Sequence, residues 1–204
     1  MRVLVACETS GTVRDAFTAR GHNAWSCDLL PPETPGSHYQ CDVFDAINDQ
    51  EWDLMIAHPP CTYLTVSANK WLKDQPPRKS GALVGNARRQ AREEAINFFM
   101  KLYNANIPRI AIENPIGCMS SVFRKPDQVI QPWMFGHGET KATCLWLKGL
   151  PKLYWTNTDN LFSARTAVDG REQRLHKLPP TQDRWKIRSK TYEGIGSAMA
   201  EQWG

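Results

Sequence analysis

Short apolar runs alternate along the chain with polar turns and with stretches of helical period. Because strands that alternate with helices are typical of α/β proteins, we expect a mostly parallel sheet with helices on both faces. A single domain should cover residues 1–204. Strands are expected at residues 3–6, 23–27, 54–57 and 109–112, another within 39–44 with Asp42 at its end, and one that a glycine turn feeds within 135–147. Helices are expected at 12–20, which Gly21 closes, and at 88–104.

A cysteine follows directly after one of these apolar runs. Residues 54–57 have strand length, and the prolines of His58-Pro59-Pro60 end ladder pairing because a proline nitrogen has no hydrogen to donate. Cys61 therefore lies just past the carboxyl end of a strand, where ligands bind in open α/β sheets. The alternative is that Cys61 is a small buried apolar residue, as most lone cysteines are.

The next strand ends in the same way, on a carboxylate. Residues 109–112 lead into Glu113-Asn114-Pro115. If the two strands are parallel neighbours, Cys61 and Glu113 face one crevice. A thiol beside a carboxyl group suits covalent addition assisted by a proton donor.

Polar residues also follow the first strands. Glu8, Ser10 and Gly11 lie in the turn before the first helix, Asp28 ends the second strand, and Asp42 is expected at the end of the third. In a nucleoside-binding unit such a turn and such an acid hold the two ends of one cofactor. Ordinary turn chemistry explains the pattern equally well.

Basic residues are concentrated between residues 62 and 92. Residues 62–86 have no clean period and predict a long exposed loop, which in a compact domain is usually a lid or a binding surface. Arg88, Arg89 and Arg92 follow, off the apolar stripe of their helix. They form either a solvated face or a set of phosphate contacts.

The amino-acid composition limits the class of protein but does not identify its function. The 204 residues are 41% hydrophobic and 23% charged, with a net charge of +4 and six cysteines that occur singly. This permits a polyanionic partner and indicates neither a disulfide framework nor a metal site. No apolar run has membrane-spanning length and Glu8 comes too early for a signal peptide, so we expect a cytoplasmic protein.

Together, Pro60-Cys61 and Glu113-Asn114 resemble the two catalytic motifs of the S-adenosylmethionine-dependent cytosine C5-methyltransferases, especially their compact phage-borne members. The resemblance implies a Rossmann-like methyltransferase fold, Cys61 as the nucleophile, and Glu113 as the group that holds the base. It assigns the methionine end of the cofactor to the first turn, the ribose to Asp28 and the adenine to Asp42. The glycine-rich loop of the family is poorly kept, since only Gly11 survives. The residues that the resemblance implies for the cofactor are Glu8, Ser10, Gly11, Asp28, Asp42 and Pro59, and those for the substrate are Pro60, Arg88, Arg89, Asn114, Lys141 and Thr143.

The segment around Lys141 and Thr143 loosely matches a basic motif of the family, although Lys141 could equally solvate the start of a strand. Residues 156–183 leave room for only a reduced recognition segment, where the family has a large one. We therefore expect DNA as the partner and a short or degenerate target sequence. A second protein that adds selectivity for the site is compatible with this expectation. Two alternatives stay open: modification of a pyrimidine nucleotide or single strand, and a catalytically silent binding protein.

Overall fold

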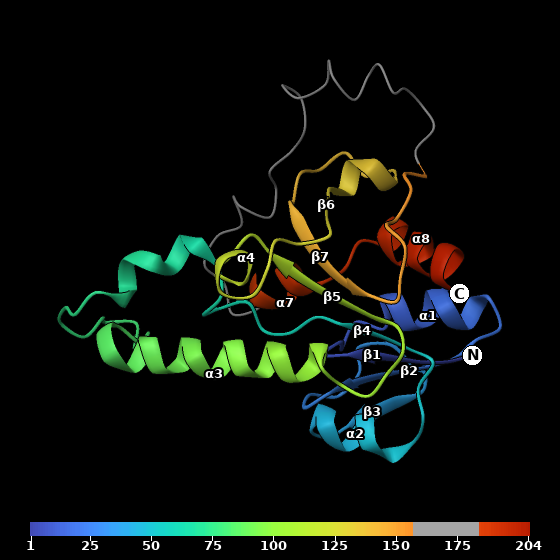
Figure 1. The fold of residues 1–204 in the computed structure, drawn as a ribbon, viewed down its shortest axis with the longest axis horizontal. Helices are drawn as coiled ribbons and strands as arrows, with labels where there is room; N and C mark the ends of the chain where they lie inside the picture. Colours follow the sequence, from blue (N-terminus) through green and yellow to red (C-terminus); the bar gives the residue numbers. More distant parts are fainter. Residues whose placement is uncertain (157–183) are drawn as a thin grey trace.

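The computed structural model describes residues 1–156 and 184–204, which form a twisted sheet of seven strands in the order β3-β2-β1-β4-β5-β7-β6 (Figure 1). All neighbours are parallel except β7, which runs antiparallel to both β5 and β6. The strands are β1 (Arg2–Ala6), β2 (Asn23–Asp28), β3 (His38–Gln40), β4 (Leu54–Ala57), β5 (Ile110–Pro115), β6 (Gln128–Ile130) and β7 (Thr143–Lys148).

Helices cover both faces of this sheet, and the alternation of strand side chains explains why. Leu54 and Ile56 of β4 join the core under α1 (Thr12–Ala19) and α8 (Glu193–Trp203). Met55 and Ala57 point the other way, into the core under α2 (Val43–Asp49) and α3 (Gly85–Tyr103). Successive residues of a strand face opposite sides of the sheet, so a strand that is apolar throughout needs a layer of helices on both faces. The predicted Rossmann-like α/β fold is confirmed.

The expected third strand is wrong at its carboxyl end. β3 stops at Gln40, and Val43 begins α2 instead of continuing the strand. The reason is Asp42, whose side chain accepts a hydrogen bond from the Phe44 backbone N–H at 2.8 Å and so caps the helix. Aspartate is among the residues that most favour this position.

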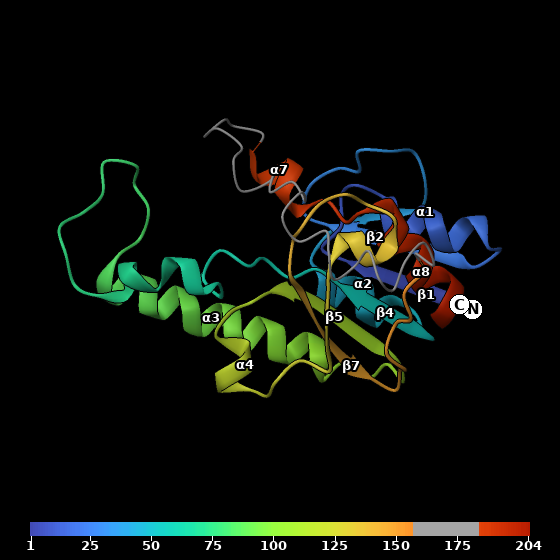
Figure 2. The ribbon, with the colours of Figure 1, turned by 90° about the horizontal axis from the view of Figure 1, so that it is seen from above.

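Residues 62–84 and the first half of α3 project from the sheet as an arm (Figures 1 and 2). The expected loop contains a 3-10 helix, η1 (Val66–Leu72), and α3 begins at Gly85, three residues before the predicted start. The remaining elements are α4 (Met119–Val122), η2 (Pro132–Phe135) and α7 (Arg184–Ser189). Of the expected recognition segment 156–183, all but Thr156 lies outside the described residues.

Both chain ends lie at the amino edge of the sheet, side by side (Figures 1 and 2). Arg109, just before β5, joins them: its guanidinium donates to the Trp203 carbonyl and contacts the sulfur of Met1. No helix in the described parts of the chain is long and apolar enough to cross a membrane.

Candidate active site

At the carboxyl edge of the sheet, Glu113 lies in β5 and Cys61 lies in the turn that follows the neighbouring strand β4. β4 and β5 pair in parallel with Ala57 opposite Ile112, so the residues that follow, His58 and Glu113, are the next in register. Cys61 lies in a tight turn whose carbonyl accepts the backbone N–H groups of Leu64 and Thr65. The turn fixes the backbone that presents the thiol.

His58 and Glu113 form a buried ion pair. Nδ1 of His58 donates to Oε2 of Glu113 at 2.7 Å, and the two side chains are only 10% and 11% exposed. Burial lowers the pKa of His58, but the hydrogen bond and charge of Glu113 raise it by more, so the net pKa is raised. Burial raises the pKa of Glu113, and the bond to His58 outweighs it, so the net pKa is lowered.

The Cys61 thiol is protonated at neutral pH in this arrangement. Burial raises its pKa, and the charge of Glu113 raises it further. Lys141 and Arg188 act in the opposite direction without prevailing. Nearby positive charge is what usually activates a nucleophilic thiol, because it lowers the pKa. The structure supplies those charges but adds burial and a carboxylate that outweigh them.

Asn114, the residue after Glu113, fixes the backbone of the proline turn before Cys61. Asn114 is buried, and its side-chain amide donates to the Pro59 carbonyl at 2.9 Å, which ties the end of β5 to the proline turn before Cys61. Its Oδ1 is buried and has no hydrogen-bond partner. Pro60 is exposed beside the cysteine.

Lys141 brings positive charge to the same edge, just before β7. Its Nζ donates to the Arg188 carbonyl at 3.0 Å and lies 5.9 Å from the Tyr192 ring centroid. Its charge also lowers the pKa of both Glu113 and Cys61. Thr143 is buried, and its hydroxyl donates to the Lys141 carbonyl. The structure thus groups Lys141 with the two catalytic candidates and gives Thr143 a supporting contact.

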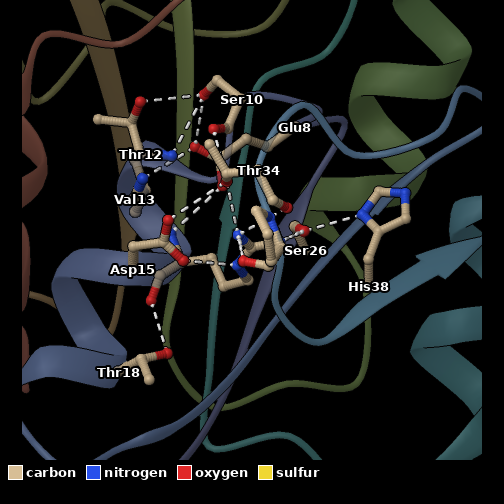
Figure 3. A network of polar contacts seen from close by, with 11 residues as sticks. Glu8, Ser10, Thr12, Val13, Asp15, Thr18, Ser26, Thr34 and His38 are labelled. Carbon is tan, nitrogen blue, oxygen red and sulfur yellow. Dashed lines mark hydrogen bonds and ion pairs between the residues drawn. The ribbon is translucent and has the colours of Figure 1, made fainter.

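The Glu8 carboxylate occupies the N-terminus of α1 (Figure 3). Oε1 accepts from the Val13 backbone N–H at 2.8 Å and from the Ser10 hydroxyl, and Oε2 accepts from the Arg14 backbone N–H. The start of a helix attracts anions because its first N–H groups have no partners in the helix. Here the chain's own carboxylate fills the place that a cofactor phosphate takes in many nucleotide-binding folds.

Gly11 allows the segment around Thr34 to pack against this turn. Its φ of 72° lies in the left-handed region, and a Cβ there would stand 2.3 Å from the Thr34 hydroxyl. Thr34 donates to the Ser10 carbonyl and accepts from the fully buried Arg14, which also donates to Ser26 (Figure 3). The turn and the 33–36 segment therefore form one rigid wall.

Asp28, Asp42 and Cys7 converge beside that wall. Burial raises the pKa of the Cys7 thiol far above its usual value, and the charges of Asp28 and Asp42 add to the effect, which places both acids close to it. Cys7 has a φ of 60°, a strained value for a residue other than glycine. Asp28 accepts the Leu30 N–H, so its carboxylate is fixed at the end of β2.

The three arginines of α3 contact the chain's own backbone. Arg88 is 5% exposed and donates to the carbonyls of Leu83 and Thr62. Arg89 donates to the Leu72 carbonyl and pairs with Asp74, and Arg92 donates to the carbonyl of Tyr63 and to Asn69. The expected solvated face is wrong for Arg88, and these guanidinium groups fasten the arm just after Cys61.

The sequence matches no known protein-family profile and no curated protein. Among solved structures, a similar chain is an E. coli protein described as a candidate DNA modification methyltransferase encoded within a prophage. The match covers 72% of this chain and 46% of that one, at 14% identity and a TM-score of 0.43. This chain thus spans less than half the length of that protein. A likeness of this size says nothing about the reaction, which must be argued from the residues of the site.

Two residues of the site carry no signal in the amino-acid sequence that marks them as functional. His58 attracts attention there only as the residue before two prolines, yet it is the partner of Glu113. Arg14 reads as an ordinary polar position of a short helix, yet it is buried under the 33–36 segment. Within residues 1–156 and 184–204, no three His, Cys, Asp or Glu side chains are grouped so that they could hold a metal ion.

Proposed function

We propose that the protein transfers a methyl group from S-adenosylmethionine to carbon 5 of cytosine in DNA through a covalent Cys61 adduct. The observation that carries this proposal is the meeting of Cys61 and Glu113 at the carboxyl ends of two adjacent parallel strands, with His58 bonded to Glu113 at 2.7 Å. A nucleophile and a carboxyl group that can pass on a proton, at one edge of the sheet, suit addition to an electron-poor ring.

The residues of the neighbouring cradle fit the cofactor. The start of α1 is filled by Glu8, which leaves no free helix N-terminus there for a phosphate. Glu8, Asp28 and Asp42 together make the cradle acidic, and S-adenosylmethionine is a cationic nucleoside without phosphate. Glu8, Ser10, Gly11 and Pro59 would lie at its methionine end and Asp28 at its ribose, with Asp42 near the adenine. When bound, the cofactor would supply an electrophilic methyl group.

The chain's own residues perform the remaining work. Carbon 5 of cytosine is a poor nucleophile until a thiolate adds at carbon 6 while ring nitrogen 3 is hydrogen-bonded to a carboxyl group. Cys61 supplies the thiolate once its thiol has lost its proton to solvent, and Glu113 supplies the carboxyl group. Asn114 keeps Pro59, and with it the turn before Cys61, at a fixed distance from β5. In duplex DNA the cytosine must leave the base stack to reach them.

Exposed basic residues support DNA as the substrate. Lys70, Lys73, Arg78 and Lys79 are exposed along the arm, and such residues bind phosphates whatever the base sequence. The charge of Lys141 acts on both Cys61 and Glu113, so in this proposal Lys141 contacts the base or its flanking phosphate. We regard residues 1–204 as one catalytic domain in which the arm takes part in binding DNA and a partner protein adds selectivity.

A transfer assay with a labelled methyl group tests the proposal on duplex DNA, single-stranded DNA and cytidine nucleotides side by side. We expect label in DNA cytosine with the wild-type chain and none with Cys61→Ser. Label in the cytidine nucleotides alone would show that the substrate is a free nucleotide and not DNA. If no substrate is labelled while calorimetry detects cofactor binding, the protein is a silent binding protein and the proposal fails.

A further inference from the structure

His58 lies between the two halves of the proposed site. Its backbone N–H donates to the Ala6 carbonyl of β1, and its ring bonds Glu113 of β5. The charged groups that face the ring are Glu113, Glu8 from the turn after β1, and Lys141 from the segment before β7. Burial opposes the imidazolium form, but the hydrogen bond and charge of Glu113 and the charge of Glu8 favour it, and the net effect raises the pKa of His58.

The second ring nitrogen of His58 has no partner. Nε2 is buried, and no described atom forms a hydrogen bond with it. A buried polar group left without a hydrogen-bond partner costs about 1–3 kcal/mol, so such groups are rare away from functional sites. The ring is thus held on one side only, by Glu113, and its other nitrogen is free of hydrogen bonds to the described residues.

The charge of Glu113 creates a difficulty that His58 can resolve. Burial raises the pKa of Glu113, but the bond to His58 and its charge outweigh burial and leave Glu113 as a carboxylate, whose oxygens only accept hydrogen bonds. Ring nitrogen 3 of cytosine also only accepts. The two atoms repel each other unless a proton lies between them, and the hydrogen-bonded proton nearest to Glu113 is the one on His58 Nδ1, 2.7 Å from Oε2.

We propose that His58 is a positioning residue that orients Glu113 and stores the proton that Glu113 donates to ring nitrogen 3. This inference rests on the proposed function for its substrate. The Cys61 S–H bond breaks first, and its proton goes to solvent. As the resulting thiolate forms its bond to carbon 6, an electron pair of the ring moves to nitrogen 3. The Nδ1–H bond of His58 breaks as a carboxyl O–H bond forms on Glu113, and that O–H bond breaks as the N–H bond forms at nitrogen 3. Neutral imidazole and a carboxylate remain, and the proton returns when the thiolate leaves.

The pair itself is tested without substrate, by following the His58 ring signals in nitrogen-15 NMR of the full chain against pH. We expect a protonation midpoint above the ordinary histidine value of 6.5 in the wild type, and a lower midpoint in Glu113→Gln. His22→Gln, at the opposite edge of the sheet, should leave the His58 midpoint unchanged. A His58 midpoint that stays in place in Glu113→Gln overturns the pair.

The proton-storing role is tested by the pH profile of kcat/KM for methyl transfer. The wild-type profile should break at the NMR midpoint of His58. His58→Gln keeps a hydrogen-bond donor for Glu113 but has no proton to give, so it should lose that break and about 10²-fold in kcat/KM, the lower end for general acid catalysis. Cofactor affinity should stay within twofold. A His58→Gln enzyme that keeps the break, or keeps its kcat/KM within twofold, overturns the inference and leaves the proposed function standing. Absence of transfer by the wild-type chain overturns both.

Discussion

Replacing Arg88 with Met separates an anchoring role from a phosphate-binding one. The methionine keeps an apolar stem in a site that is 5% exposed. It removes two hydrogen bonds from a charged donor, at 3.3 Å to the Leu83 carbonyl and 3.1 Å to the Thr62 carbonyl. It also removes the guanidinium 5.0 Å from the Tyr63 ring centroid. The arm should therefore be held less firmly to α3.

The magnitude follows from these contacts. Two bonds at about 1.5 kcal/mol each and a ring contact of about 0.5–1 kcal/mol are lost. Nε of Arg88 is buried without a partner, and its removal returns about 1–2 kcal/mol. The expected net destabilisation is about 2 kcal/mol.

Urea unfolding gives the free energy of unfolding, and a titration of DNA binding against salt gives the number of phosphate contacts. Arg88→Met should lower the free energy of unfolding and leave the number of phosphate contacts unchanged. The matched control is Arg78→Met, which removes an exposed guanidinium 3.8 Å from the Trp71 ring centroid. It should lower stability by no more than about 1 kcal/mol, the value of one exposed ring contact, and flatten the salt slope by about 0.9. The reasoning is refuted if the two variants exchange these results.

Three further predictions concern the site. Cys61→Ser should abolish methyl transfer while cofactor affinity, measured by calorimetry, stays nearly intact, because the thiol serves the base; transfer within a few-fold of wild type would contradict this. Asp28→Ala should weaken cofactor binding by about 1–3 kcal/mol, the range for a charge-assisted hydrogen bond, and unchanged affinity would mean that the ribose carboxylate lies elsewhere. The ion pair should stabilise the fold most between about pH 4.5 and 6.5, since the contribution of the raised His58 pKa is lost as pH rises and that of the lowered Glu113 pKa is lost as pH falls. Comparing the unfolding free energies of wild type and His58→Gln across pH measures it, and a difference that keeps growing up to pH 9 would show that the sign is wrong.

The parallel sheet and its edge could be predicted because they depend on local patterns. Apolar runs of strand length mark β1, β4 and β5, and the residues after β4 and β5 fall at one edge by the rules of parallel pairing. The start of α2 was missed because Val43 and Phe44 favour strands on their own, and one side-chain cap from Asp42 decides otherwise.

The arginine contacts could not be predicted in the same way. A guanidinium that binds backbone carbonyls needs no partner residue of a given type, so nothing in the sequence marks the partner. The carbonyls held by Arg88 and Arg92 lie 26 and 29 residues away along the chain. Likewise the His58–Glu113 pair spans 55 residues, and only the register of β4 on β5 joins its members.

The two chain ends meet at the edge of the sheet opposite to the thiol, tied to each other through Arg109. A purification tag or a DNA-reading module joined to either end would therefore lie at the amino edge of the sheet. It would not cover Cys61 and Glu113 at the carboxyl edge. The same closeness means that a short linker could join the old ends and new ends could be opened in the projecting arm. Such a circularly permuted chain would keep every pair of neighbouring strands in the sheet. Only the order of the strands along the chain would change.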